Sequence, residues 1–365
     1  MQSSGTVPDV GVPADDLRRL VERPGPFVSV VLGTEGRVQN AAQGVERRWQ
    51  ALRQQLEGAG APAAALEAVD ALVPDAHLAA DGLVVLADHT GALVTERLDE
   101  PPTADRVTAG AVPDLVPVLA ARQHRVPHIV VLADRGGADV FGVTRGGRLT
   151  TLTAGDGEPE RKVAGGGWSH RRFQQRAEDD WAHQAREVVQ ELVRLARDLQ
   201  PRVIVLGGDV RAVQLIRDDL PGELVERTHV IDPGRADDGS EAARREQVRR
   251  LVQTAVAEDT VAALEVFREE HGQEDRAVAG PQPTIDALAQ SAVGLLLVHD
   301  TDLPARVGDD PLSIELDGSD GAPVRLVDAL VRAALVTGAG VRVVPAAGPV
   351  PDGIGAILRW HPGPA

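Results

Sequence analysis

The sequence predicts an α/β protein divided into three domains, and three observations lead to this prediction. Short runs of valine, isoleucine and leucine alternate with longer segments of helical periodicity along the chain. Its 365 residues exceed what one hydrophobic core usually serves. A polar, turn-rich stretch over residues 232–240 marks a boundary, so we expect domains over residues 1–124, 125–234 and 240–365.

The first domain is expected to be α/β or α+β. Apolar residues at helical spacing predict its helices, and β-branched runs bounded by turn residues predict its strands. We expect a helix over 14–22, a strand over 27–32, helices over 45–56 and 62–72, and a hairpin over 82–94. The helix over 45–56 carries Arg47, Arg48 and Arg53. These arginines form either a solvated helix face or contacts to RNA phosphates.

The second domain is expected to begin with a β-hairpin, and the third with a long helix. Two β-branched runs around Asp134 to Gly137 predict a hairpin over 128–143. In the second domain a strand over 148–152, a long helix over 169–199 and a buried strand over 203–206 follow. In the third we expect helices over 241–267, 284–292 and 326–337, and strands over 294–299, 341–344 and 356–360. This alternation predicts a compact α/β/α layer domain.

Composition excludes several function classes. A net charge of −17 and a pI near 5.0 disfavour a protein that coats DNA or RNA by charge, so phosphate binding must be local. The absence of cysteine excludes disulfides, thiol catalysis and cysteine metal sites. No apolar run approaches the roughly 18 residues that span a bilayer, and the first residues lack signal-peptide features. We therefore expect a cytoplasmic protein without a membrane partner.

The most unusual segment is a run of glycines with basic and aromatic neighbours. Gly165, Gly166 and Gly167 precede Trp168 in a chain with four Trp, four Phe and no Tyr. Cations but no acids occur over residues 161–177, namely Arg161, Lys162, Arg171, Arg172 and Arg176. Glycines let a backbone approach a ligand closely, and a local reversal of charge suits a surface that faces phosphates. The alternative is an ordinary exposed loop with Trp168 packed on its own domain.

Other candidate sites have simple structural alternatives. The histidines show no metal-ligand spacing, no nucleotide-binding fingerprint occurs, and we expect neither a metal nor a cofactor. Asp134, Asp139 and Asp209 lie at predicted strand ends or turns, where paired carboxylates could hold Mg²⁺ for nuclease chemistry. The simpler interpretation is that Asp134 forms a turn and Asp209 is a helix N-cap. The segment from Gly280 to Thr284 precedes a helix and presents backbone N–H groups to an anion or serves only as a cap.

The glycine run resembles a known motif. Gly166, Gly167, Trp168 and Ser169, followed by Arg172 and Phe173, resemble the G-G-Q-S-x-x-R-F loop of the archaeal and eukaryotic class I release factors and Pelota, with Trp168 in place of the catalytic Gln. Residues 279–288, 337–341 and 353–359 are similar to the last domain of that family. The resemblance is closest to the bacterial branch that includes the hibernation factor Balon. It implies an RNase H-like middle domain and a C-terminal domain of the kink-turn-binding ribosomal-protein type.

The resemblance also implies a function. It implies a factor that binds the A site of the 70S ribosome and the rRNA of the peptidyl-transferase centre, with elongation factor Tu as delivery partner. The implied RNA contacts are Gly165, Gly166, Gly167, Trp168, Ser169, His170, Arg171, Arg172 and Arg176, with Arg161 and Lys162. The first domain would face the decoding centre, although it lacks the N-I-K-S motif.

The substitution at Trp168 changes the expected chemistry. The family's Gln places the water that attacks the peptidyl-tRNA ester, whereas an indole has one N–H donor and no comparable acceptor. We therefore expect no catalytic residue, and a role in ribosome hibernation or protection under stress. The alternatives are a rescue factor that hydrolyses peptidyl-tRNA, and a scaffold without a ribosomal role.

Overall fold

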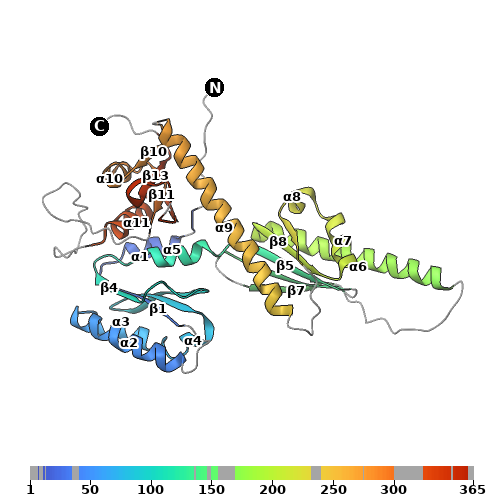
Figure 1. Ribbon diagram of the computed structural model, residues 1–365, viewed down its shortest axis with the longest axis horizontal. Coiled ribbons are helices and arrows are strands. Elements are labelled where there is room, and N and C mark those ends of the chain that lie inside the picture. The colour runs from blue at the N-terminus through green and yellow to red at the C-terminus, as the bar shows by residue number, and fades with distance from the viewer. Residues whose placement is uncertain are drawn as a thin grey trace. The chain divides into compact units, whose positions relative to one another are not determined.

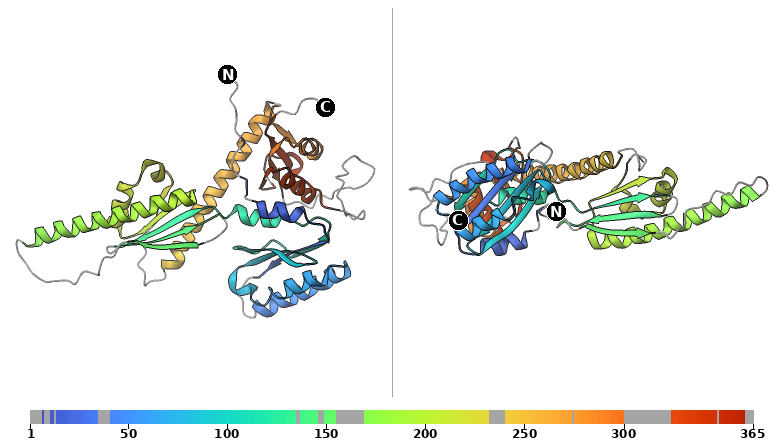
Figure 2. Two further views of the ribbon diagram at one scale, coloured as in Figure 1. Left: turned by 180° about the vertical axis from the view of Figure 1, so that it is seen from behind. Right: turned by 90° about the horizontal axis from the view of Figure 1, so that it is seen from below.

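The computed structural model describes most of the chain. The described residues are 7, 11–12, 14–34, 41–134, 137–145, 149–154, 169–231, 240–273, 275–299, 324–346 and 348–360, with side chains left undescribed at 79, 152–154, 169–181 and 240–242. They form three sheets covered by helices, which confirms the α/β class (Figures 1 and 2). The chain divides into two compact units, unit 1 (residues 1–123 and 259–365) and unit 2 (residues 124–258). The finer division into three domains stays a prediction.

The first sheet of unit 1 is antiparallel and lies between two layers of helices. Its strands, in the order β3-β2-β1-β4, are β1 (Phe27–Gly33), β2 (Gly82–Asp88), β3 (Gly91–Leu98) and β4 (Arg106–Gly110). Its helices are α1 (Asp15–Val21), α2 (Ala41–Gly58), α3 (Ala63–Asp70), α4 (Ala76–Ala79) and α5 (Val116–Gln123). In β1, Val28 and Val30 pack with α2 and α3, whereas Phe27 and Val31 pack with α1 and α5 (Figure 1). The predicted hairpin over 82–94 is confirmed.

The second sheet of unit 1 is mixed. Its strands, in the order β10-β13-β11-β12, are β10 (Ala277–Ala279), β11 (Val293–Val298), β12 (Gly340–Val343) and β13 (Ile354–Leu358), the last preceded by the short helix η1 (Pro351–Gly353). Helices α10 (Pro281–Ala289) and α11 (Leu326–Val336) pack in one core with α1 and α5. The opposite face is covered by Ala263 and Phe267 of α9 (Ser240–Gly272).

Polar contacts also join the two sheets of unit 1. The buried carboxylate of Asp114 lies 2.9 Å from Arg106 Nη2 and 3.1 Å from Arg325 Nη1, and thus links β4 to the start of α11. The amide of Gln123 donates to Val343 O at 2.9 Å and accepts from Val343 N at 3.0 Å. Residues far apart in the sequence therefore share both a core and buried polar contacts within this unit.

Unit 2 is built on a five-stranded mixed sheet. Its strands, in the order β7-β6-β5-β8-β9, are β5 (His128–Ala133), β6 (Ala138–Val143), β7 (Leu149–Ala154), β8 (Val203–Gly208) and β9 (Thr228–Val230), of which β5, β8 and β9 are parallel. Helices α6 (Ser169–Leu199) and α7 (Val210–Asp219) cover one face, and α8 (Gly222–Val225) contributes Leu224 to the same core. Residues 248–256 of α9 cover the other face. The predicted hairpin over 128–143 and helix over 169–199 are confirmed.

His128 makes the stability of unit 2 depend on pH. Burial lowers the pKa of this imidazole, against the effect of Val126 O, which lies 2.8 Å from Nδ1. As the pH falls below about 6.5, the unfolded chain takes up a proton that the folded chain does not, so the free energy of unfolding should decrease by at most about 1.4 kcal/mol per pH unit. Urea unfolding of the wild type and of His128→Asn near pH 7.5 and pH 5.5 tests this. An equal pH dependence in both proteins would contradict it.

Candidate nucleic-acid interface

The predicted RNA-binding loop connects β7 to α6. Strand β7 ends at Ala154 and α6 begins at Ser169. Arg161, Lys162, Gly165, Gly166, Gly167 and Trp168 lie outside the described residues. Ser169, His170, Arg171, Arg172 and Arg176 lie on the first turns of α6, where the backbone alone is described. The structure thus supports the predicted entry of this segment into a long helix, while the RNA contacts stay a prediction.

The sheet holds α6 through an extensive apolar face. Ala185, Val188, Leu192 and Ala196 are buried in one core with β5, β6 and β8. Gly142 of β6 allows this close approach, because a Cβ at that position would lie 2.6 Å from Leu199 Cδ1. Residues 185–199 of α6 are therefore fixed firmly to the sheet.

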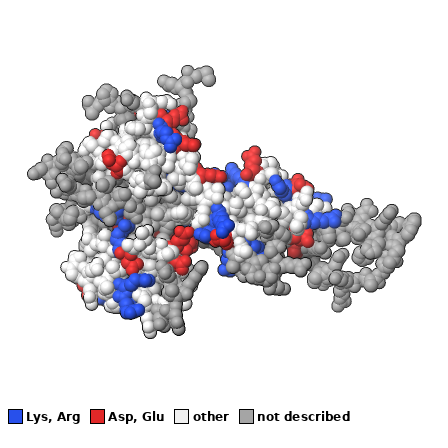
Figure 3. Space-filling view, viewed as in Figure 1, with Lys and Arg blue, Asp and Glu red and all other residues white. Residues whose placement is uncertain are grey.

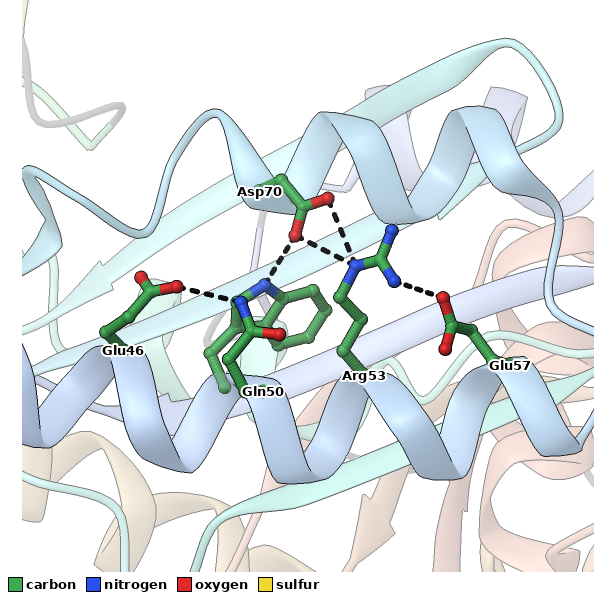
Figure 4. Close-up of polar contacts among 6 residues, drawn as sticks. Glu46, Gln50, Arg53, Glu57 and Asp70 are labelled. Carbon is green, nitrogen blue, oxygen red and sulfur yellow. Dashed lines mark hydrogen bonds and ion pairs between the residues drawn. The ribbon is translucent and has the colours of Figure 1, made fainter.

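Arg53 is held by two carboxylates in unit 1. Its Nε lies 3.1 Å from both oxygens of Asp70, and its Nη1 pairs with Glu57 (Figure 4). The hydrogen bond to Asp70 raises the pKa of Arg53 above its usual value. Asp70 also accepts a hydrogen bond of 2.7 Å from Nε1 of the buried Trp49. A phosphate at Arg53 would have to compete with these two carboxylates, so its surroundings favour a structural role.

Arg48 and Arg47 differ in their surroundings. Arg48 Nη2 donates to Gly33 O at 2.5 Å, and its Nε lies 3.3 Å from Asp105. Asp105 in turn accepts from Gly33 N at 2.7 Å, so Arg48 helps to fix the end of β1. Arg47 is exposed, and its Nε donates to Gln43 O at 3.3 Å. Among the three arginines, Arg47 therefore has the surroundings that best suit a phosphate contact, which stays a prediction.

Two of the acidic residues at the strand ends, Asp134 and Asp209, have the structural roles that the sequence favours. Asp134 Oδ1 accepts from Gly137 N at 3.0 Å, as in a turn. Asp209 Oδ1 accepts from the backbone N–H groups of Arg211 and Ala212, and thereby caps α7. Across the described part of the chain, no group of three or more potential ligands could hold a metal ion. These observations favour the turn and the cap over magnesium binding.

The cap at Asp209 provides a direct test. We expect Asp209→Ala to lower the free energy of unfolding by about 1 kcal/mol, because two backbone N–H groups at the start of α7 lose their acceptor. Asp209→Ser should retain most of the stability, since serine also caps helices. Thermal unfolding with and without millimolar Mg²⁺ separates the two roles. A stabilising effect of Mg²⁺ that is lost in both variants would contradict the cap and support a metal site.

The segment before α10 also has a structural role. Gly280 is the N-cap, with φ of 84°, and Pro281 and Pro283 occupy the first turn. Proline has no backbone N–H, so this turn offers few donors to an anion. The buried Thr284 hydroxyl donates to Gly280 O at 2.8 Å. The geometry therefore favours the cap over an anion site.

Comparison with known proteins gives a match in unit 2 that continues into the rest of α9. Residues 127–273 match the family model of bacterial archaeo-eukaryotic release factor family 2. The matched segment contains the Gly166 to Phe173 run, so the resemblance to release factors is confirmed over this segment. The narrower resemblance to the Balon branch stays a prediction.

Two curated relatives come from Mycobacterium tuberculosis. They are Uncharacterized protein Rv2629 of strain ATCC 25618 / H37Rv and Uncharacterized protein MT2704 of strain CDC 1551 / Oshkosh. Each is 27% identical to this chain over 224 residues. The matched region is 60% of this chain and 60% of each relative, so the chain spans about 60% of the length of these relatives.

Similar solved structures include Pelota and a translation termination-like factor. Archaeal Pelota, in a model of ribosome-bound archaeal Pelota and ABCE1, is 16% identical over 98% of this chain and 97% of that one, with a TM-score of 0.43. Dom34 of S. cerevisiae is 11% identical over 80% and 78%, with a TM-score of 0.42. Archaeoglobus fulgidus Pelota is 14% identical over 96% and 93%, with a TM-score of 0.38. Among the described helices, none is long and apolar enough to cross a membrane.

Proposed function

We propose that this protein is a ribosome-binding translation factor of the release-factor and Pelota type. The observation that carries the proposal is the family match over residues 127–273, which includes the Gly166 to Phe173 run. The cations over residues 161–176 support it, because an RNA-rich partner requires local positive charge on a chain of net charge −17. The proposed site is the ribosomal A site, with the glycine run near the peptidyl-transferase centre.

We further propose that the factor occupies the ribosome without hydrolysis. Trp168 replaces the Gln that places the attacking water in release factors, and an indole cannot accept and donate hydrogen bonds as an amide does. A tryptophan instead stacks on bases, which contributes about 1 to 3 kcal/mol per base. The proposed role is therefore hibernation or protection of idle ribosomes, as in the branch of Balon, with elongation factor Tu as the proposed delivery partner.

Sedimentation tests ribosome binding. The full-length protein is mixed with idle 70S ribosomes at low and moderate salt, and we expect it in the ribosomal fraction under both conditions. Trp168→Ala should weaken binding about tenfold or more because the stacking contact is lost. Absence of the wild-type protein from the 70S fraction at both salt concentrations would contradict the proposal.

A hydrolytic rescue factor is the second candidate. The retained Gly166, Gly167, Ser169 and Arg172 around Trp168 favour it, because they preserve most of the release-factor motif. Release of labelled peptide from stalled ribosomal complexes distinguishes the two functions. We expect no release by the wild type, whereas release at a rate little changed in Trp168→Gln would support hydrolysis.

A further inference from the structure

The outward face of α6 carries a row of polar, mainly basic residues. His183, Arg186, Gln190, Arg194 and Arg197 are all exposed and follow one another at spacings of three or four. At 100° per residue they fall within a sector of about 80°, and at 1.5 Å per residue they extend over about 21 Å. We call these five residues the α6 ridge. It lies opposite the buried face that packs on the sheet.

The arginines of the α6 ridge make few ion pairs, although residues 182–199 carry three acids, Glu187, Glu191 and Asp198, beside the three arginines. Arg194 lies 3.0 Å from Glu191, and His183 lies 3.5 Å from Glu187. The side chains of Arg194 and His183 remain 68% and 70% exposed, and such surface pairs are weak. Arg186 and Arg197 are exposed, and neither makes an ion pair with another residue that the structure describes. A phosphate can therefore reach these guanidinium groups without breaking a strong ion pair.

The α6 ridge continues the spacing of the proposed RNA-binding segment. When the same helical sector is extended toward the N-terminus of α6, it includes the positions of Arg172 and Arg176. It also includes the acidic Asp179, which lies between Arg176 and His183 in the sequence. From Ser169 to Arg197 the helix extends about 42 Å. Figure 3 shows acidic and basic side chains interspersed on the face in view.

We propose that the α6 ridge binds the phosphate backbone of RNA. This inference rests on the proposed function and extends its contact from the glycine run along α6. Arginine guanidinium groups recognise phosphate oxygens through paired hydrogen bonds. The described part of α6 has no large exposed hydrophobic residue, so the ridge lacks the apolar anchors of a protein-binding hot spot. The ridge has no Phe, Tyr or Trp, and His183 is its single aromatic ring, which favours backbone contacts over base recognition.

The experiment compares two sets of arginines in the full-length protein. The ridge variant carries Arg186→Gln, Arg194→Gln and Arg197→Gln. The control variant carries Arg97→Gln, Arg217→Gln and Arg268→Gln, which are exposed arginines on β3, α7 and α9. Affinities for 70S ribosomes and for protein-free rRNA are measured over a series of salt concentrations, and circular dichroism checks that both variants are folded.

The ridge variant should lose at least tenfold in affinity for both probes near 0.1 M salt. The slope of log affinity against log salt should decrease by about 2 to 3, because three phosphate contacts are lost. The control variant should stay within about twofold of the wild type. If the wild type and the ridge variant bound rRNA with the same affinity at every salt concentration, the inference would be overturned. This holds even if the variant bound ribosomes more weakly, because the ridge would then contact ribosomal protein and not RNA. Ridge-dependent binding to rRNA without any binding to ribosomes would support the inference and overturn the proposed function.

Discussion

Replacing Gly208 by alanine should destabilise unit 2 by about 4 kcal/mol or more. Gly208 ends β8 with φ of 119°, a conformation that L-residues rarely adopt. A Cβ there would lie 1.9 Å from the carbonyl oxygen of Ala133 in the neighbouring strand. That oxygen cannot simply move aside, because it accepts a hydrogen bond of 2.8 Å from Asp209 N. Backbone strain, a steric clash and a weakened hydrogen bond therefore act together.

Urea unfolding followed by circular dichroism measures the effect. Gly222→Ala is the matched control, because Gly222 begins α8 with open space around its missing side chain. Alanine at Gly222 should change the free energy of unfolding by less than about 1 kcal/mol, with stabilisation expected. If Gly208→Ala cost no more than this control, the close approach of β5 and β8 would be wrong.

The sequence predicts the strongly patterned elements and misses the weakly patterned ones. The hairpin of β5 and β6 and the long helix α6 are predicted because periodicity and turn residues agree there. Strand β4 is missed, since its five residues show no alternation and are all half-buried. The three-residue strands β9 and β10 are too short to carry a pattern and depend on neighbouring strands for their hydrogen bonds.

Helix α9 shows why long-range packing escapes a sequence pattern. Its apolar residues recur at helical spacing in the sequence, but they pack in two different cores. Leu251 and Ala255 contribute to the core of unit 2, whereas Leu264 and Phe267 contribute to a core of unit 1. Val261, three residues before Leu264 and thus at helical spacing from it, is 51% exposed. Helical periodicity identifies apolar positions, but it does not say which sheet each position meets.

The candidate site is predictable to the extent that its contacts are local. The turn at Asp134 and the cap at Asp209 involve neighbouring residues, and both are confirmed. Two other partners are not local, because Asp70 lies 17 residues from Arg53 and Asp105 lies 57 residues from Arg48, and no local pattern links them. For the glycine run, the family match supports the resemblance, and the RNA contacts depend on a partner outside the chain.

Removing the carboxylate of Asp114 should destabilise unit 1 by about 3 kcal/mol. Asp114 is 1% exposed and pairs with Arg106 and Arg325, whose side chains are 29% and 16% exposed. Its backbone N–H donates to Ser29 Oγ at 2.9 Å, so the loop cannot easily turn the remaining residue toward water. Asp114→Ala would leave two largely desolvated guanidinium groups without their shared counter-charge, and losing one partner of a buried pair costs more than the pair contributes.

The comparison of three variants separates this effect from a general loss of charge. Glu67→Ala removes an exposed acid on α3 and should change the free energy of unfolding by less than about 0.5 kcal/mol. Arg106→Met should cost less than Asp114→Ala, because Asp114 would keep Arg325 as a partner. Urea unfolding of all three variants gives this order directly. If Asp114→Ala matched Glu67→Ala, the buried charges between β4 and α11 would contribute nothing measurable to the stability of unit 1.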